Sequence, residues 1–385
     1  MNPTSSTNPA SRRHGRNDIR LNAVVALLAI VASGASVADE EVGSEPVLQA
    51  EAAARDSEKN GSWVFVPIPV ANPTVGNGAQ LGALYLYPKS SDGPPATSGV
   101  GVMATDNGTR LAAAFHDQSL SQDRFRLTGA LAGGRLQAQY FGVGTGSVFA
   151  DHPVKYGFEG EAFAVLGLMR VAEGSDWFAG LSIQQAAATL QFDTPDVAAP
   201  LPDIQGKIRI FGGGPQVQYD ARDNTTYPTT GEDIIFRGFG YRGSWGREPT
   251  FYKADADFRI YRSITPALVV AGRLRLQGAS DDTPFFALPS MDVAGVSSDR
   301  YRDNRVVSTS VELRYVLASR WGLMAFVDAG RAAATASALR DAQTIVSYGG
   351  AVRWQPSAAR RLYLGLNVAF STDASAVYIQ VGETF

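Results

Sequence analysis

The sequence lacks cysteine and is poor in charged residues. None of its 385 residues is Cys, so neither a disulfide framework nor a thiolate metal site is possible. Asp, Glu, Lys and Arg make up 18 % of the chain, below the roughly 25 % of an average soluble domain. The formal net charge of −3 argues against a nucleic-acid partner. These absences exclude disulfide scaffolds, zinc-thiolate domains and basic nucleic-acid binders.

Long apolar runs are also scarce. The one candidate for a helical span, 23–32 (AVVALLAIVA), is shorter than the about 20 residues that cross a bilayer. It follows four arginines between 12 and 20 and precedes the small residues of 36–38. This order is typical of an export signal. The sequence therefore predicts a signal peptide over 1–38, followed by a flexible periplasmic lead-in over the acidic, polar segment 39–62.

What the chain does contain, over 63–385, is alternation of apolar and polar residues with a period of two. In 305–317, Val, Thr, Leu and Tyr fall on one face of an extended strand, and Ser, Glu and Arg fall on the other. Such strands place one face in an apolar medium and the other against polar groups. A soluble β-sandwich would also alternate, but the predicted signal peptide and the aromatic end at Phe385 favour an outer-membrane β-barrel.

Alternating runs between turn signals predict about sixteen strands. They lie near 80–87, 98–105, 109–117, 124–132, 135–142, 155–168, 177–191, 207–220, 232–242, 251–262, 266–278, 305–317, 320–331, 344–355, 360–371 and 374–385. An even number of strands returns both chain ends to the same side of the membrane. The predicted fold is therefore all-β, a transmembrane antiparallel β-barrel with an N-terminal signal peptide.

The predicted connections differ in length on the two sides of the membrane. If the first strand runs outward, the periplasmic turns include the tight segments 106–108, 133–134, 263–265 and 356–357. The outer connections then include the longer loops 143–154, 192–206, 279–304 and 332–343. Short periplasmic turns and long outer loops are the usual asymmetry of such barrels. Only the turn at 220–231 departs from it.

Several stretches resemble the BamA/TamA superfamily, also known as bacterial surface antigen barrels. They are 63–85 (the entry into the first strand), 219–231 (YDARDNTTYPTTG), 284–290 (PFFALPS), 298–315 (SDRYRDNRVVSTSVELRY), 325–330 (AFVDAG), 347–354 (SYGGAVRW) and 381–385 (VGETF). The resemblance implies a sixteen-stranded surface-antigen barrel over 63–385, located in the bacterial cell outer membrane.

The resemblance also implies a function and partners. Members of this superfamily insert or translocate outer-membrane and surface proteins, usually through POTRA domains that precede the barrel. The about forty residues between Ala38 and the predicted first strand lack the βααββ pattern of such a domain. The expected partners are outer-membrane lipid (lipopolysaccharide and phospholipid) and client outer-membrane proteins or an assembly partner. No cofactor is expected.

The sixth outer loop departs from the family pattern. In the superfamily, an Arg-Gly-aromatic tip of this loop folds into the lumen and pairs with acidic groups on the wall. The corresponding residues here are Ala294, Gly295 and Val296, so the Arg is absent. The string Phe236-Arg237-Gly238-Phe239 matches the motif, but it falls on a predicted strand and is interpreted as barrel wall.

The acidic wall residues are present, because Glu312 and Asp328 face the lumen by parity. Our hypothesis is that Arg300 or Arg302 pairs with Asp328 in place of the missing Arg and keeps the loop tucked inside. The alternative is a solvated loop, with Asp328 facing water.

The predicted working part is the lateral seam between the first strand, 80–87, and the last strand, 374–385. Gly78 and Gly82 would weaken the first strand and Gly382 the last, which ends at Phe385. An opening seam would suit protein insertion or translocation. A passive, porin-like pore or a structural barrel is the alternative.

An enzyme is not expected. Some membrane barrels are phospholipases with Ser, His and a polar orienting residue, but only His116 and His152 follow the predicted signal peptide. Neither lies beside a recognisable nucleophile motif, and no G-x-S-x-G occurs. Both are predicted to be solvated rim or loop residues.

Overall fold

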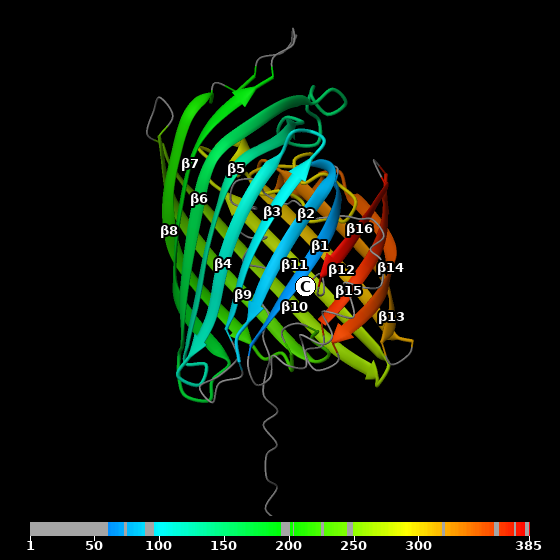
Figure 1. Ribbon diagram of the computed structural model, residues 1–385. Helices are drawn as coiled ribbons and strands as arrows, with labels where there is room; N and C mark the ends of the chain where they lie inside the picture. Colours follow the sequence, from blue (N-terminus) through cyan, green and yellow to red (C-terminus); the bar gives the residue numbers. More distant parts are fainter. Residues whose placement is uncertain are drawn as a thin grey trace, which may run out of the picture.

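The structure, a computed structural model, describes residues 61–72, 75–88, 96–193, 201–202, 204–224, 227–244, 249–317, 320–357, 362–372, 375–381 and 385. These residues form one antiparallel sheet of sixteen strands, in which each strand pairs with its neighbours in chain order. The sheet curls into a barrel, so that β1 and β16 come to lie next to each other (Figure 1). The predicted all-β barrel is therefore confirmed. Among the described residues, no helix is long and apolar enough to cross a membrane.

The strands are long in the middle of the chain and shorter near its ends. They are β1 (Ser62–Asn72), β2 (Gly76–Leu86), β3 (Thr97–Thr105), β4 (Arg110–Leu120), β5 (Phe125–Tyr140), β6 (Val154–Arg170), β7 (Trp177–Phe192), β8 (Gly206–Asp220), β9 (Gly231–Ser244), β10 (Thr250–Thr265), β11 (Leu268–Ala279), β12 (Arg305–Val316), β13 (Trp321–Ala333), β14 (Ile345–Ser357), β15 (Leu362–Ser371) and β16 (Ser375–Val381). Two short 3-10 helices, η1 (Phe285–Ala287) and η2 (Ala338–Arg340), lie in loops.

Alternation along the strands determines which side chains face outward. In β10, Tyr252 is 61 % exposed and Asp257 is 1 % exposed. In β12, Leu313 is 47 % exposed and Glu312 is 1 % exposed. An outward charge at the bilayer midplane costs about 2–4 kcal/mol, which fixes the register with charges inside. The outward apolar and inward polar faces predicted for these strands are confirmed.

The first strand is not where the sequence predicted it. β1 occupies Ser62–Asn72, and the predicted first strand, 80–87, is part of β2. β1 contains Pro67 and Pro69, which are disfavoured in strands because proline cannot donate to a ladder. An edge position tolerates them, and β1 is the edge of this sheet. The sequence did not predict this strand because two prolines so close together are more typical of a loop than of a strand.

A second error in the prediction restores the correct number of strands. The predicted strands 124–132 and 135–142 are one continuous strand, β5, which pairs with β6 from Phe125 to Tyr140. The predicted turn at Gly133-Gly134 therefore lies within the wall. Gly134 has φ +134°, and a Cβ there would approach the carbonyl oxygen of Arg110 to 2.2 Å. The glycines allow close backbone approach rather than a turn.

The two ends of the barrel differ in the length of their connections. We call the end where β1 begins the base rim and the opposite end the loop rim. The loop rim carries the long segments 141–153, 280–304 and 334–344, whereas the base rim has short turns at 121–124 and 266–267. The predicted asymmetry is confirmed. The turn at 106–109 lies on the loop rim, however, because the missed strand β1 inverts the direction of β2, β3 and β4.

The lumen divides into an apolar half and a charged half. Toward β4–β8, buried side chains such as Leu136, Tyr156, Phe158, Leu190 and Phe192 form a hydrophobic cluster. Toward β9–β12, the inward side chains include many Arg and Asp residues. The long loop 280–304 meets both halves. The site described next therefore lies inside the barrel.

Candidate functional site

The loop 280–304 folds back into the lumen, as the tucked-loop hypothesis predicts. It forms a narrow internal hairpin, in which Ser290 and Arg302 make a β-bridge and the Met291 N–H donates to the Tyr301 carbonyl at 3.1 Å. Most of its side chains from Phe285 to Asp303 are buried. The loop therefore has its own backbone structure and is not a solvated surface loop.

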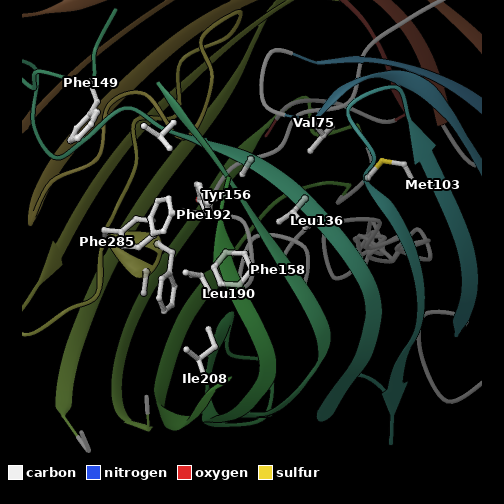
Figure 2. Close-up of a cluster of buried hydrophobic side chains, with 14 of the residues drawn as sticks. Val75, Met103, Leu136, Phe149, Tyr156, Phe158, Leu190, Phe192, Ile208 and Phe285 are labelled. Atoms are coloured by element: carbon white, nitrogen blue, oxygen red, sulfur yellow. The ribbon is translucent and has the colours of Figure 1, made fainter. Parts of the chain in front are cut away.

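Two adjacent phenylalanines, Phe285 and Phe286, anchor this loop in the apolar half of the lumen. Figure 2 shows Phe285 beside Tyr156 and Phe192. The Phe285 ring centroid lies 4.9 Å from that of Tyr140, 5.3 Å from that of Tyr156 and 5.7 Å from that of Phe192. Phe286 packs edge-on against Phe158, at 5.2 Å. Aromatic pairs at such distances contribute about 0.5–1.5 kcal/mol each beyond their area burial. The cluster holds the loop against the wall, beside a cavity lined by Leu136, Phe158, Ile208 and Phe286.

The loop tip contacts the opposite wall through its backbone. The Ala294 N–H donates to Asp328 Oδ2 at 3.0 Å, and Ser310 and Ser347 also donate to this carboxylate. Gly295 has φ +74°, and a Cβ there would lie 3.0 Å from the Ala369 Cβ. Only glycine combines this backbone conformation with this close approach. The tip thus replaces the family's arginine with a backbone donor and a glycine.

The predicted pairing of Arg300 or Arg302 with Asp328 is not found among the described contacts of Asp328. Arg302 is buried within the loop, where its guanidinium donates to the Phe286 carbonyl at 3.0 Å and pairs with Asp299. The Arg300 guanidinium lies over the Phe141 ring, 5.5 Å from its centroid. These arginines organise the loop itself. The two prolines and two aromatics of 284–290 were the signal that could have revealed its anchor.

Glu312, the other acidic wall residue, pairs with a neighbour on its own strand. Its carboxylate accepts from Arg314 Nη2 at 2.7 Å, and both side chains are almost fully buried. The Arg314 guanidinium also donates to the carbonyl oxygens of Phe385 (2.9 Å) and Pro228 (3.4 Å). Arg314 therefore connects the wall to the end of the chain and to the turn between β8 and β9. This role was not predicted.

A continuous series of ion pairs crosses the lumen from β5 and β6 to β11 and the tucked loop. It runs from the base rim to the tucked loop through Arg170, Asp123, Arg126, Asp220, Arg222, Asp233, Arg259, Asp257, Arg273 and Asp292, each paired with the next. We call this series the charge ladder. Buried carboxylates of this kind require partners, because an unpaired charge in a low-dielectric interior is costly.

Two carboxyl groups of the charge ladder lie outside the strands, Asp292 in the tucked loop and Asp123 in the turn before β5. The Arg273 guanidinium, 2.6 Å from Asp292, lowers the pKa of that loop carboxyl below its ordinary value, and Arg275 adds to this effect against the opposing effect of burial. At the base rim, burial raises the pKa of Asp123, but hydrogen bonding and the charge of Arg126 outweigh it, so the pKa is lowered. Both carboxyls are therefore ionised at neutral pH.

The seam between β1 and β16 is the only neighbouring strand contact without a ladder among the described residues. Every other consecutive pair of strands is joined by a ladder of paired residues, whereas the described residues of β1 and β16 lie side by side without one. Gly78 and Gly82 lie in β2, opposite Val70 and Val66 of β1. The expectation that they belong to the seam strand is therefore wrong. The seam strand is β1.

The last predicted seam residues have different positions. Gly382 lies outside the described residues. Phe385 turns into the lumen, where it packs with Tyr261 and Ala271, and it is 5 % exposed. The Arg314 guanidinium lies 5.7 Å from the centroid of its ring. The structure thus places the aromatic end of the chain inside the barrel rather than along its lipid-facing edge.

Three other features singled out in the sequence are the Phe236–Phe239 string, His152 and His116. Phe236-Arg237-Gly238-Phe239 is part of β9, so its interpretation as barrel wall is confirmed. His152 lies in the loop-rim segment 141–153, as predicted. His116 is not a simple rim residue, because Ser98 and Gln118 bond to its ring. Among the described residues, no cluster of His, Cys, Asp and Glu could hold a metal ion.

Comparison with solved structures finds the same barrel fold. BamA from Haemophilus ducreyi lacking POTRA domains 1–3 matches with a TM-score of 0.53 and 15 % identity, over 84 % of this chain and 70 % of that chain. CdiB from Acinetobacter baumannii matches with a TM-score of 0.53 and 9 % identity, over 84 % of this chain and 58 % of that chain. CdiB from Escherichia coli matches with a TM-score of 0.55 and 13 % identity, over 84 % of this chain and 61 % of that chain. The chain thus spans about three-fifths of the length of the CdiB structures.

Sequence comparison identifies the family. No curated protein matches the chain. The model of the Omp85 superfamily domain matches residues 98–385, about three quarters of the sequence, which includes β3 to β16 and the tucked loop. The chain therefore belongs to the Omp85 superfamily, and its fold is a barrel of the BamA type.

Proposed function

We propose that this barrel assists the insertion or translocation of outer-membrane or surface proteins, with the seam between β1 and β16 as its working part. The observation that carries this proposal is the absence of a ladder between the described residues of β1 and those of β16. A client strand can pair with an edge that has free backbone groups, because exposed strand edges are templates for strand addition. The family membership of the chain supports the same role.

The sequence of β1 supports a weak seam. Pro67 and Pro69 lack backbone N–H groups, and residues two apart in a strand direct their N–H groups to the same edge. The other edge of β1 is paired with β2 over its full length. Two donors are therefore missing at the seam edge. A seam with fewer hydrogen bonds requires less free energy to open.

A passive pore, the second candidate, receives less support. Phe285 and Phe286 occupy part of the apolar half of the lumen, beside a cavity lined by Leu136, Phe158 and Ile208, and the charge ladder spans the lumen beside the loop. A conducting pore needs a continuous water-filled path through the lumen. The packing of the loop 280–304 favours a barrel that acts through its side.

The proposed location is the bacterial outer membrane. A signal peptide over 1–38 would direct export of the chain and then be cleaved. The loop rim would face outward and the base rim would face the periplasm. The outward apolar faces of the strands would contact phospholipid in the inner leaflet and lipopolysaccharide in the outer leaflet. Client outer-membrane proteins or an assembly partner remain the expected protein partners.

A seam lock tests this function. The chain has no Cys, so a single Cys on β1 and one on β16 form the only possible disulfide. We expect oxidation of a pair that cross-links to reduce at least tenfold the insertion of an unfolded, labelled eight-stranded outer-membrane barrel into proteoliposomes. Reduction of the disulfide should restore insertion.

A matched control locks two strands that are already paired. Phe65 and Ala83 lie opposite each other on β1 and β2, so Phe65→Cys with Ala83→Cys adds a disulfide without closing the seam. This control should insert the client normally in both redox states. Equal insertion by the seam-locked and reduced barrels would overturn the proposal.

A further inference from the structure

A polar cluster interrupts the outer, lipid-facing surface near the base rim. Ser98 of β3 lies opposite His116 of β4. Ser98 shares its face of β3 with Val100 and Val102, which are 55 % and 54 % exposed. Because alternate residues of a strand share a face, the serine and the histidine both point outward. Polar groups on this surface of a membrane barrel require an explanation.

The geometry of the cluster orders three groups around the imidazole. Ser98 Oγ lies 2.8 Å from His116 Nδ1, and Gln118 Oε1 lies 3.3 Å from His116 Nε2. The amide oxygen can only accept, so it fixes the proton on Nε2. The Nδ1 lone pair is then free to accept the Ser98 proton. A nucleophile, a base and a group that orients the base stand in sequence, the arrangement used by Ser-dependent hydrolases.

A fourth residue supplies a donor and indicates the depth of the cluster. The Tyr87 hydroxyl lies 3.2 Å from Ser98 Oγ, and its ring meets the His116 ring edge-on at 5.8 Å. Tyr87 is part of a row of aromatic rings that continues through Tyr85 to Trp63, at centroid distances of 4.8 and 5.1 Å. Tyr and Trp concentrate at the headgroup level of membranes. Glycerophospholipid esters lie beside this level.

We propose that Ser98, His116 and Gln118 form a site that cleaves the acyl esters of glycerophospholipids. Ser98 Oγ attacks the ester carbonyl carbon as its proton passes to His116 Nδ1. Tyr87 can donate to the oxygen that becomes negative. The ester C–O bond then breaks, and the glycerol oxygen takes the proton from Nδ1, which leaves an acyl-serine and a lysophospholipid.

The second half of the reaction returns the site to its starting state. A water molecule gives its proton to His116 Nδ1 and its oxygen attacks the acyl carbon. The bond to Ser98 Oγ breaks, Oγ regains the proton and the fatty acid leaves. No metal, oxidant or other co-reactant is needed. Gln118 is a positioning residue, since it acts only through the imidazole.

This activity is additional to the proposed function and involves different strands, because β3 and β4 do not form the seam. Only the leaflet that supplies the lipid depends on the proposed orientation. With the base rim in the periplasm, it is the inner, phospholipid leaflet. A seam-locked barrel should therefore hydrolyse lipid at the normal rate, which separates failure of this proposal from failure of the insertion role.

The first test uses an alkyl fluorophosphonate probe on the full-length barrel in phospholipid-containing micelles. We expect labelling at Ser98, identified by mass spectrometry, and none in Ser98→Ala. General base catalysis contributes about 10²–10⁴-fold, so His116→Ala should label about 100-fold more slowly. Ser244→Ala, at the other end of the barrel and without a neighbouring His, should label normally and serves as the control.

The second test measures fatty acid release from vesicles of phosphatidylethanolamine and phosphatidylglycerol. Release should stop in Ser98→Ala and fall in Gln118→Leu, and Gln118→Glu, which restores an acceptor, should recover it. Heat-modifiable migration in gels shows that each variant is folded. Labelling of Ser98 that does not depend on His116, or equal release by the parent and Ser98→Ala barrels, would overturn the proposal.

Discussion

At the level of single residues, the tucked loop depends on a few small groups at its tip. The family's arginine is replaced by the Ala294 N–H, which donates to Asp328. Parity predicted that Asp328 faces the lumen, and this is correct. The donor could not be predicted, because a backbone N–H is present at every non-proline position and leaves no trace in the sequence.

Replacement of Asp328 with Ala should loosen the loop. It removes the acceptor of Ala294, Ser310 and Ser347, and a buried donor left without a partner costs about 1–3 kcal/mol. We expect faster proteolysis within 279–304 in intact, folded barrels. Asp328→Asn retains an acceptor oxygen and should have a smaller effect. Unchanged protease sensitivity of Asp328→Ala would contradict the importance of this contact.

Gly295→Val should displace the loop tip. The valine would adopt φ +74°, which costs about 1–3 kcal/mol outside glycine, and its Cβ would press against Ala369. The measurement is again the rate of cleavage in 279–304. Gly146→Val, in another loop with no atom within 4 Å of the added Cβ, should leave the rate unchanged. If both variants behave alike, the tip does not depend on this packing.

The pH dependence of the loop contact follows from Asp292. Arg273 lowers its pKa below 3.8, so the pair stabilises the folded barrel at neutral pH and is lost only as the pH falls below about 3.8. Asp292→Asn should therefore lower the urea midpoint equally at pH 7.5 and pH 5, and less at pH 3. Asp281→Asn is the control. A difference that already disappears at pH 5 would contradict this assignment.

At the level of elements, the strands of the C-terminal two thirds were predictable and the first strand was not. From β6 to β16, charges such as Asp257 and Arg273 must face inward, so alternation determines each strand and its register. β1 has no charged residue and two prolines, and Gly133-Gly134 looks like a turn. Local sequence cannot distinguish an edge strand of this kind from a loop, because β1 is a strand only through its pairing with β2.

The loop 280–304 is the element most open to test. Phe285 and Phe286 are buried in an aromatic cluster, and truncation of a buried Phe to Ala costs about 3–5 kcal/mol. The double variant Phe285→Ala/Phe286→Ala should expose the loop to protease without unfolding the barrel, because the wall ladders are intact. Phe125→Ala, on the exposed outer surface, is the matched control. Equal cleavage rates would show that the aromatic anchor does not hold the loop.

At the level of the whole molecule, the strand number was correct although two predictions behind it were wrong. The prediction missed β1 and counted β5 as two strands, so the total number of strands was still correct. The even number of strands places the start of β1 and the end of β16 on the same side of the membrane. The tucked loop was a hypothesis based on the resemblance, whereas its aromatic contacts join residues far apart in the sequence and could not be predicted from it. The seam shifted from 80–87 to β1, which makes Pro67 and Pro69 more important than the glycines of β2.

We propose a barrel that is plugged by its own loop and acts through the seam between β1 and β16. Single-channel conductance in planar bilayers tests it most directly, with the intact protein and with a variant lacking 284–303. We expect small, flickering currents from the intact barrel and large, steady currents after the deletion. Large, steady, ion-selective currents from the intact barrel would contradict it and would identify the protein as an open pore.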